Sequence, residues 1–305
     1  MGKSVTKKLF LLWFAVLLTG FFCNSEAGAA DSIRIERLER RLETLEQREQ
    51  SRYRKGEKEI LTYYKNGFKM RTRDNQFKFQ IGGRIMHDWG FFNESETFES
   101  TFGQQENGAR FRRVRFFMEG ILYNAMKFKF DIDVDGGDNG VTFKDMYIGV
   151  AHIPILGNFQ VGHFKRPASL DSVTSSKYLT FIERSLTNTF FKTRNTGFAL
   201  FNHAFKKKLT WSVFVNKETS ENPPDFRIDG DWNVTSRVTG LPYITEDGKR
   251  WVHMGASWSY EKATDNQVTF SGARDSEITT TFLTTGTFAA RKINIVGFEG
   301  AVNLD

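Results

Sequence analysis

The feature that most constrains this chain is a run of strictly alternating apolar and charged residues from Met126 to Val134. Successive side chains of a β-strand point to opposite faces, so such a run forms a strand with one apolar and one charged face. The apolar positions are Met126, Phe128, Phe130, Ile132 and Val134, and the charged ones are Lys127, Lys129, Asp131 and Asp133. The run therefore predicts an amphipathic strand.

The same period of two recurs along much of the chain beyond Phe77. Phe77–Trp89 and the segment from Arg113 to Leu122 both place apolar residues on one face and charged residues on the other. Further strands are expected at Phe143–Val150, Phe159–Phe164, Thr196–Phe201, Leu209–Val215, Val234–Val238, Val252–Tyr260, Ile278–Phe288 and Ile293–Val302. Turn signals such as Asp135-Gly136-Gly137 separate them. The fold class predicted is all-β and antiparallel, with about ten or eleven strands.

The N-terminus carries the marks of an export signal. Lys3, Lys7 and Lys8 precede an apolar run from Leu9 to Phe22, and Ala27-Gly28-Ala29 supplies a small-residue cleavage pattern. Residues 1–29 are therefore expected to be a signal peptide. Cys23 is the only cysteine and lies inside this segment, so disulfides and thiolate metal sites are not expected in the mature chain.

Two architectures fit long amphipathic strands in an exported chain. A soluble β-sandwich buries its apolar faces, whereas a transmembrane β-barrel turns them toward lipid and keeps the charged faces around a lumen. No further run of about 20 apolar residues follows the signal, which excludes helical membrane spans. Aromatic residues near strand ends, among them Trp89, Trp211, Trp258 and Tyr260, favour the barrel because they resemble interfacial girdles.

Residues 30–66 are expected to form a periplasmic coiled-coil and linker segment before the barrel at 67–305. Ile35, Leu38, Leu42 and Leu45 follow a heptad spacing, and charged residues occupy most other positions from Asp31 to Gln50. About two heptads are marginal as an isolated helix, so the segment needs partners. The alternative is a disordered charged tether. Ser51 to Lys65 is interpreted as the linker.

Several motifs resemble the phosphate-selective porin O and P family of outer-membrane porins. The resemblance is carried by Val161-Gly162-His163-Phe164-Lys165-Arg166-Pro167, by the segment from Ser175 to Ser185, and by Arg194-Asn195-Thr196-Gly197. Gly82-Gly83, Arg112-Arg113-Val114-Arg115, Lys144-Asp145-Met146-Tyr147 and Arg237-Val238-Thr239-Gly240-Leu241-Pro242 extend it to other strands. It covers essentially the whole chain.

This resemblance implies a homotrimer in the outer membrane, with sixteen strands in each subunit and a loop that folds into the lumen and narrows it. By position the constriction loop corresponds to Ala168 through Thr193. The chain stops at Asp305, before enough strands for closure and without a terminal aromatic residue. Since an open sheet edge leaves backbone groups unsatisfied in hydrocarbon, the expectation is an incomplete barrel from a fragment or a truncated product.

The candidate anion-binding residues are basic side chains expected to line the pore. Guanidinium groups bind oxyanions through paired hydrogen bonds, and ammonium groups add local positive potential. The wall residues are Arg84, Arg113, Arg115, Lys127, Lys129 and Arg237, and the constriction-loop residues are Arg166, Lys177 and Arg184. In the other interpretation, acidic residues on the same wall pair with these cations, and the pairs only hold the wall together. These acidic residues are Asp88, Glu119, Asp131, Asp133 and Asp145. In this interpretation Glu183 fastens the loop to the wall in the same way.

Other chemistry is not supported by the motifs. Asp131 to Gly136 begins like a calcium-binding loop, but Thr142 stands where a glutamate is required, and the histidines lack metal-ligand spacing. No catalytic motif is present, so neither a cofactor nor an enzymatic activity is expected. The net charge of +7 is mild, and basic residues that alternate with acidic ones in an exported chain do not indicate nucleic-acid binding.

The leading functional hypothesis is passive diffusion of small anions, among them phosphate or polyphosphate, through a pore lined with arginine and lysine. A nonselective or sugar-admitting porin and an exported β-sandwich with a binding or adhesin role are the alternatives.

Overall fold

The computed structural model describes residues 36–48, 59–136, 140–191, 193–217, 232–272 and 279–304. The segment expected to be a signal peptide, residues 1–29, lies outside the described residues. Contacts divide the chain into two units, Met1–Glu59 and Ile60–Asp305. None of the helices in the described part is long and apolar enough to cross a membrane.

In the first unit, residues 36–48 form a helix, as the heptad spacing predicts. Leu38, Leu42 and Leu45 are 58%, 51% and 61% exposed, so the apolar stripe of this helix has no cover within the described residues. An ion pair between Arg40 and Glu36 spans one helical turn at 2.8 Å. The partner helices of a coiled coil remain a prediction.

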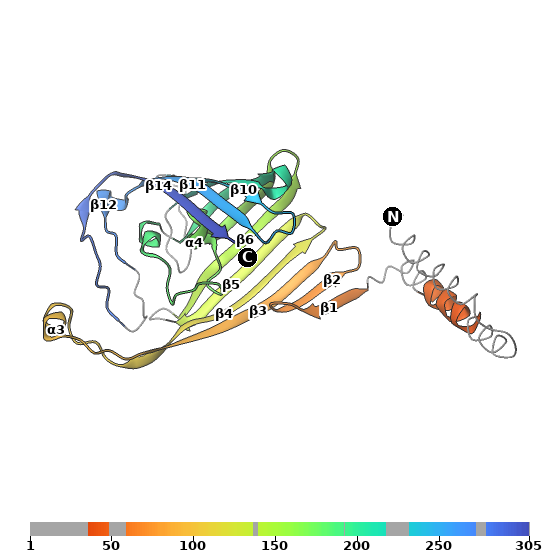
Figure 1. The fold of residues 1–305 in the computed structure, drawn as a ribbon, viewed down its shortest axis with the longest axis horizontal. Coiled ribbons are helices and arrows are strands. Elements are labelled where there is room, and N and C mark those ends of the chain that lie inside the picture. The colour runs from red at the N-terminus through yellow and green to blue at the C-terminus, as the bar shows by residue number, and fades with distance from the viewer. Residues whose placement is uncertain are drawn as a thin grey trace. The chain divides into compact units, whose positions relative to one another are not determined.

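The second unit is built on one antiparallel sheet of twelve strands, in which each strand pairs with the next strand of that sheet along the chain (Figure 1). The strands are β1 (Ile60–Tyr64), β2 (Phe68–Thr72), β3 (Lys78–Gly90), β4 (Gly108–Leu122), β5 (Met126–Gly136), β6 (Gly140–Ile153), β7 (Gly157–Lys165), β8 (Arg194–Ala204), β9 (Leu209–Lys217), β10 (Asn233–Ile244), β11 (Trp251–Lys262) and β14 (Lys292–Asn303). β1 and β14 are its edges, so the sheet does not close on itself. One sequential sheet is the order of a barrel wall rather than that of a sandwich.

Short helices and one small hairpin lie in the connections between the strands. They are α3 (Glu96–Phe102), α4 (Leu170–Val173), η2 (Leu186–Phe190), η3 (Phe205–Lys207), η4 (Thr264–Asn266) and the small hairpin of β12 (Gln267–Val268) with β13 (Phe288–Ala289). At one end of the sheet the connections are short turns, at residues 73–77, 123–125, 154–156, 205–208 and 245–250. The opposite end carries the long connections 91–107, 166–193 and 263–291. This asymmetry is typical of outer-membrane barrels.

One expected boundary and one expected strand are wrong. β1 lies inside the segment interpreted as a linker, so the sheet begins at Ile60 rather than at residue 67. The dipeptide Asn66-Gly67, with positive φ at both residues, forms the β1–β2 turn and is a typical hairpin signal. The strand expected at Ile278–Phe288 is also wrong, because within its described part only Phe288 belongs to a strand, β13. Its run of threonines has strand propensity but no apolar face.

The two faces of the sheet differ as the alternation predicts. Large apolar side chains are exposed on one face, and they include Ile85, Phe116, Ile148, Phe198, Val213, Val238, Met254, Trp258, Val296 and Phe298. On the other face a small apolar cluster is buried, with Phe164, Ala199 and Phe214 in its centre and Tyr147 beside it. This inner face also carries the charged side chains described below.

A glycine at the centre of the inner wall lets neighbouring strands approach closely. Gly162 on β7 has φ +138°, and a Cβ atom there would lie 2.3 Å from the carbonyl oxygen of Met146 on β6. Only glycine adopts this conformation without strain. The motif that contains Gly162 therefore has a structural reason in the packing of β6 against β7.

Candidate functional site

The connection from β7 to β8, residues 166–193, runs across the inner face of the sheet. At its start the backbone N–H of Leu170 donates to Glu299 Oε2 on β14 at 2.6 Å. Farther along, Glu183 Oε2 accepts from Arg112 Nη1 on β4 at 2.8 Å. β4 and β14 are far apart in the strand order, so the sheet curves around the loop that joins them. We call residues 166–193 the inner loop.

The base of the inner loop is anchored by a buried arginine. Arg166 is 1% exposed; its Nη2 lies 2.7 Å from Glu261 Oε1 on β11, and its Nε donates to Thr235 Oγ1 on β10 at 3.0 Å. The hydroxyl of Ser172 donates back to the carbonyl oxygen of Arg166 at 3.1 Å. Arg166 therefore joins the loop to two wall strands and does not face open lumen.

The first turn of the inner loop is held by a second set of contacts. Lys165 Nζ donates to the carbonyl oxygens of Ser172 and Thr174 at 2.9 and 2.8 Å, at the end of α4. Arg184 Nη2 donates to the same Thr174 carbonyl at 2.7 Å, and its guanidinium also contacts Asp171. Burial lowers the pKa of Arg184, and the carboxylate of Asp171 opposes that shift. Arg184 thus stabilises the fold of the loop.

A β-bulge creates the contact between the inner loop and β4. Met86 pairs with Arg113 and His87 pairs with Phe111, so Arg112 is an extra residue in β4. A bulge interrupts the alternation, and both arginines reach Glu183, with Arg113 Nη2 at 3.4 Å from its Oε2. The side chain of Arg112 is fully buried and also pairs with Asp88. We call Arg112, Arg113 and Glu183 the loop clamp.

Much of the remaining wall charge is neutralised across strands. Arg115 Nε donates to Asp133 Oδ2 at 2.5 Å, and Arg237 Nη2 donates to Glu299 Oε1 at 2.5 Å. Other ion pairs connect Lys129 with Glu119 and Asp145, and Arg194 with Asp145. The interpretation that acidic residues hold basic ones in the wall is confirmed for these side chains.

Three of the expected cations form no ion pair among the described residues. Arg84 stands directly opposite Arg115 in the β3–β4 register, and its buried Nε has no hydrogen-bond acceptor in that part of the chain. Lys127 Nζ donates only to the amide oxygen of Asn158, at 3.2 Å. Lys177 of the inner loop lies over the ring of Phe117 on β4, 5.3 Å from its centroid. None of the three is therefore held in the wall by an ion pair with a described carboxylate.

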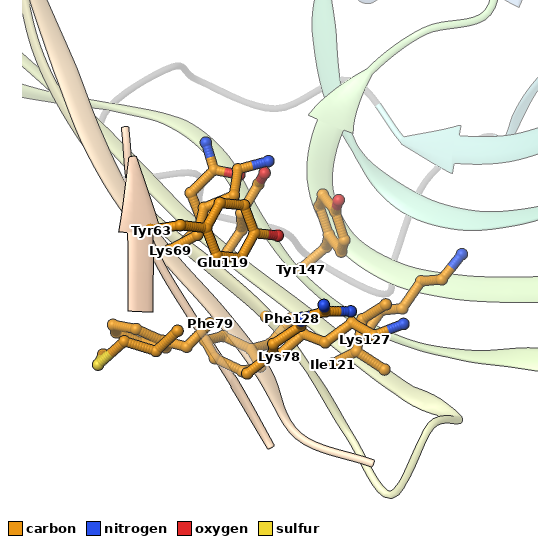
Figure 2. A pocket seen from close by; sticks show the side chains of 13 residues that line it. Tyr63, Lys69, Lys78, Phe79, Glu119, Ile121, Lys127, Phe128 and Tyr147 are labelled. Atoms are coloured by element: carbon orange, nitrogen blue, oxygen red, sulfur yellow. The ribbon is translucent and has the colours of Figure 1, made fainter. Parts of the chain in front are cut away.

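A hollow of about 320 Å³ lies along β1 to β6 near Lys127 (Figure 2). Figure 2 shows Tyr63, Lys69 and Glu119 gathered together, with Tyr147 across from them. Lys78 and Arg71 add two more cations to the lining, against the single carboxylate of Glu119. The guanidinium of Arg71 also lies 5.9 Å from the ring centroid of Tyr63. The end of the inner wall near the short turns is therefore basic.

The sequence-predicted residues thus separate into two groups. Arg113, Arg115, Lys129, Arg166, Arg184 and Arg237 are engaged by carboxylates, whereas Arg84, Lys127 and Lys177 are not. Sequence reasoning missed Arg112 as a wall cation, because strict alternation places it on the apolar face. It also missed Lys165 and Arg194, which stand at strand ends, although the basic residues in the two motifs there were a usable signal.

Within the described residues, no group of three or more histidine, cysteine, aspartate or glutamate side chains is placed to hold a metal ion. Asp133, which the calcium-like motif contains, instead accepts from the backbone N–H of Val114 at 2.9 Å and from Arg115. His253 Nε2 lies 2.8 Å from Glu299 Oε1 on the inner wall.

Comparison with known proteins agrees with this architecture. The sequence model of the family described as phosphate-selective porin O and P matches residues 79–303. The chain is also similar to Porin O of Pseudomonas aeruginosa strain PAO1, with 24% identity over 211 residues. That match covers 68% of this chain and 47% of Porin O, so the chain spans about half the length of this curated relative. Because the family match extends over most of the sheet, including the inner loop and the strands that hold it, the chain belongs to the phosphate-selective porin O and P family.

Proposed function

We propose that this protein is an outer-membrane porin through which small anions, phosphate or polyphosphate among them, diffuse passively. Its family supports this assignment, and so does the sheet, whose exposed face is apolar enough to contact lipid while its inner face is charged. No bond is made or broken in this function. The inner loop narrows the passage because it crosses the inner face between β14 and β4.

The observation that carries the proposal is the environment of Arg84. Like charges directly opposite each other destabilise a sheet, and Arg84 and Arg115 are such a pair. Asp133 is ion-paired with Arg115, whereas Arg84 forms no ion pair among the described residues, and its Nε is buried there without an acceptor. Asp131 and Asp133 act on the charge of Arg84 only from a distance, so an anion that passes this point adds counter-charge. Arg84 is therefore the wall residue best placed to bind one.

The neutralised arginines have a different part in the same function. Conduction requires each site to be weak enough to release its ion. Pairing with Asp133 and Glu299 lowers the net positive charge that Arg115 and Arg237 present to the lumen. We propose that few uncompensated cations, rather than a continuous row of free arginines, set a modest preference for anions.

Replacing Arg84 by glutamine tests the proposal. We expect the anion-to-cation permeability ratio to fall by about threefold, because one desolvated positive charge is lost from the narrow part of the wall. The measurement is the reversal potential in a planar bilayer under a KCl gradient. Lys249→Gln removes the same charge from an exposed turn and should leave the ratio unchanged. A cation-selective wild-type pore would refute the anion assignment.

We further propose that residues 1–29 direct export and are removed, and that the helix at 36–48 joins a periplasmic coiled coil of a homotrimer. Support comes from the exposed leucine stripe, which an isolated short helix cannot bury. Leu42→Asp should shift the detergent-solubilised protein from trimer toward monomer on dilution, as measured by light scattering after size-exclusion chromatography. Arg37→Asp, away from the stripe, should not. If Leu42→Asp leaves the trimer intact at every dilution, the coiled coil does not hold it together.

A pore with little charge preference, open to neutral solutes such as sugars, is the second candidate. The ion pairs of Arg115, Lys129 and Arg237 favour it, since they remove much of the free positive charge from the wall. Block of chloride current by millimolar phosphate separates the two candidates. The anion porin is blocked, and the nonselective one is not.

A further inference from the structure

A second cavity, of about 700 Å³, lies between the base of the inner loop and the wall strands near their short turns. Its lining contains four basic side chains, Lys127, Lys165, Lys207 and Arg237, together with two histidines, and no carboxylate of the described residues. It differs in this respect from the wall around β4 and β5, where ion pairs hold most of the charged side chains. We call it the basic cavity.

Most basic groups of this cavity form no ion pair with a described residue. Lys127 donates to a side-chain amide, and Lys165 donates to two backbone carbonyls. Lys207, in the β8–β9 turn, forms no ion pair with any described residue. Only Arg237 is paired, with Glu299 at 2.5 Å. A ligand with two negative charges fits this lining.

Part of the lining is apolar. Phe164, Ala199 and Phe201 come from β7 and β8, and Pro167 and Val173 come from the inner loop. Phe164, Ala199 and Phe201 belong to or pack against the buried cluster, in which the rings of Phe164 and Phe214 lie 4.8 Å apart. The apolar surface is therefore held in place before any ligand enters. Inorganic phosphate, which is hydrated on all sides, gains nothing from such a surface.

We infer that the basic cavity binds an organic phosphate, a phosphate monoester whose dianionic group contacts the lysines while a small aromatic or aliphatic group packs against Phe201 and Phe164. This inference rests on the proposed function, because it names a class of solute for the same lumen. Cations and apolar side chains that face one cavity select for a solute that carries both kinds of group.

Titration calorimetry on the full-length protein in detergent tests the inference with phenyl phosphate and inorganic phosphate as probes. Phenyl phosphate should bind about tenfold more tightly, because its ring is removed from water. Lys207→Gln should weaken both ligands about equally. Phe201→Leu should weaken phenyl phosphate alone, and Lys249→Gln should change neither. Circular dichroism of each variant checks folding, and if Phe201→Leu misfolds, the wild-type preference for phenyl phosphate decides.

Equal affinity for phenyl phosphate and inorganic phosphate would overturn the inference. Benzoate that binds as tightly as phenyl phosphate would also overturn it, because the cavity would then select for the ring rather than for the phosphate group. Both results leave the anion porin intact, because anion selectivity is measured independently by reversal potential. Conversely, a pore without anion preference that still binds phenyl phosphate would overturn the proposed function but not this site.

Discussion

Arg166→Gln is expected to lower the free energy of unfolding by about 3 kcal/mol, a large effect for one substitution. The guanidinium is 1% exposed and lies 2.7 Å from the carboxylate of Glu261, whose side chain is 16% exposed. Glutamine leaves that carboxylate without its ion-pair partner, and it also loses the hydrogen bond to Thr235. The measurement is urea unfolding of the protein in phospholipid vesicles, followed by tryptophan fluorescence.

Two further variants separate the causes of this loss. Arg166→Lys keeps the charge, but its ammonium group cannot reach both Glu261 and Thr235 as the planar guanidinium does. It should therefore recover only part of the stability. Arg250→Gln removes an arginine from an exposed turn and should change the free energy by less than about 0.5 kcal/mol. If Arg166→Gln is as stable as Arg250→Gln, Arg166 does not anchor the inner loop.

Glu183→Gln should open the loop clamp and change conduction in two ways. Without the carboxylate, Arg112 and Arg113 lose the contact at 2.8 and 3.4 Å that holds the far end of the inner loop on β4. The loop moves away from the wall, so single-channel conductance rises. Two guanidinium groups lose their loop counter-charge at the same time, so the preference for anions also rises. Glu183→Gln should also lower the free energy of unfolding by about 2 kcal/mol, because charge-assisted hydrogen bonds are lost.

Single-channel recording and reversal potential measure these two effects separately. Glu106→Gln removes a negative charge from an exposed loop and should change neither quantity. A Glu183→Gln pore whose conductance is unchanged while its anion preference rises would mean that the carboxylate acts by charge alone. The loop would then be held by its other contacts, such as Lys177 with Phe117.

Local features of the sequence were sufficient for most of the strands from β3 onward and for their faces. Alternation predicted the β5 segment and the opposite orientation of Phe128 and Lys127, because side-chain direction in a strand depends only on position. The same reasoning predicted the charged inner face and the apolar outer face. It failed at Ile278–Phe288, where strand propensity without an apolar face was not enough.

The sequence by itself determined which side chains of a regular strand can reach the interior, since a period of two is a local property of the backbone. Only the tertiary structure decided which of those cations are free. Three features that join separate parts of the chain are responsible. They are the bulge that turns Arg112 inward, the pairing of Arg115 with Asp133 across strands, and the crossing of the inner loop from Glu299 to Arg112. Charge balance depends on distance in space, and a one-residue change of register reverses every side chain of a strand.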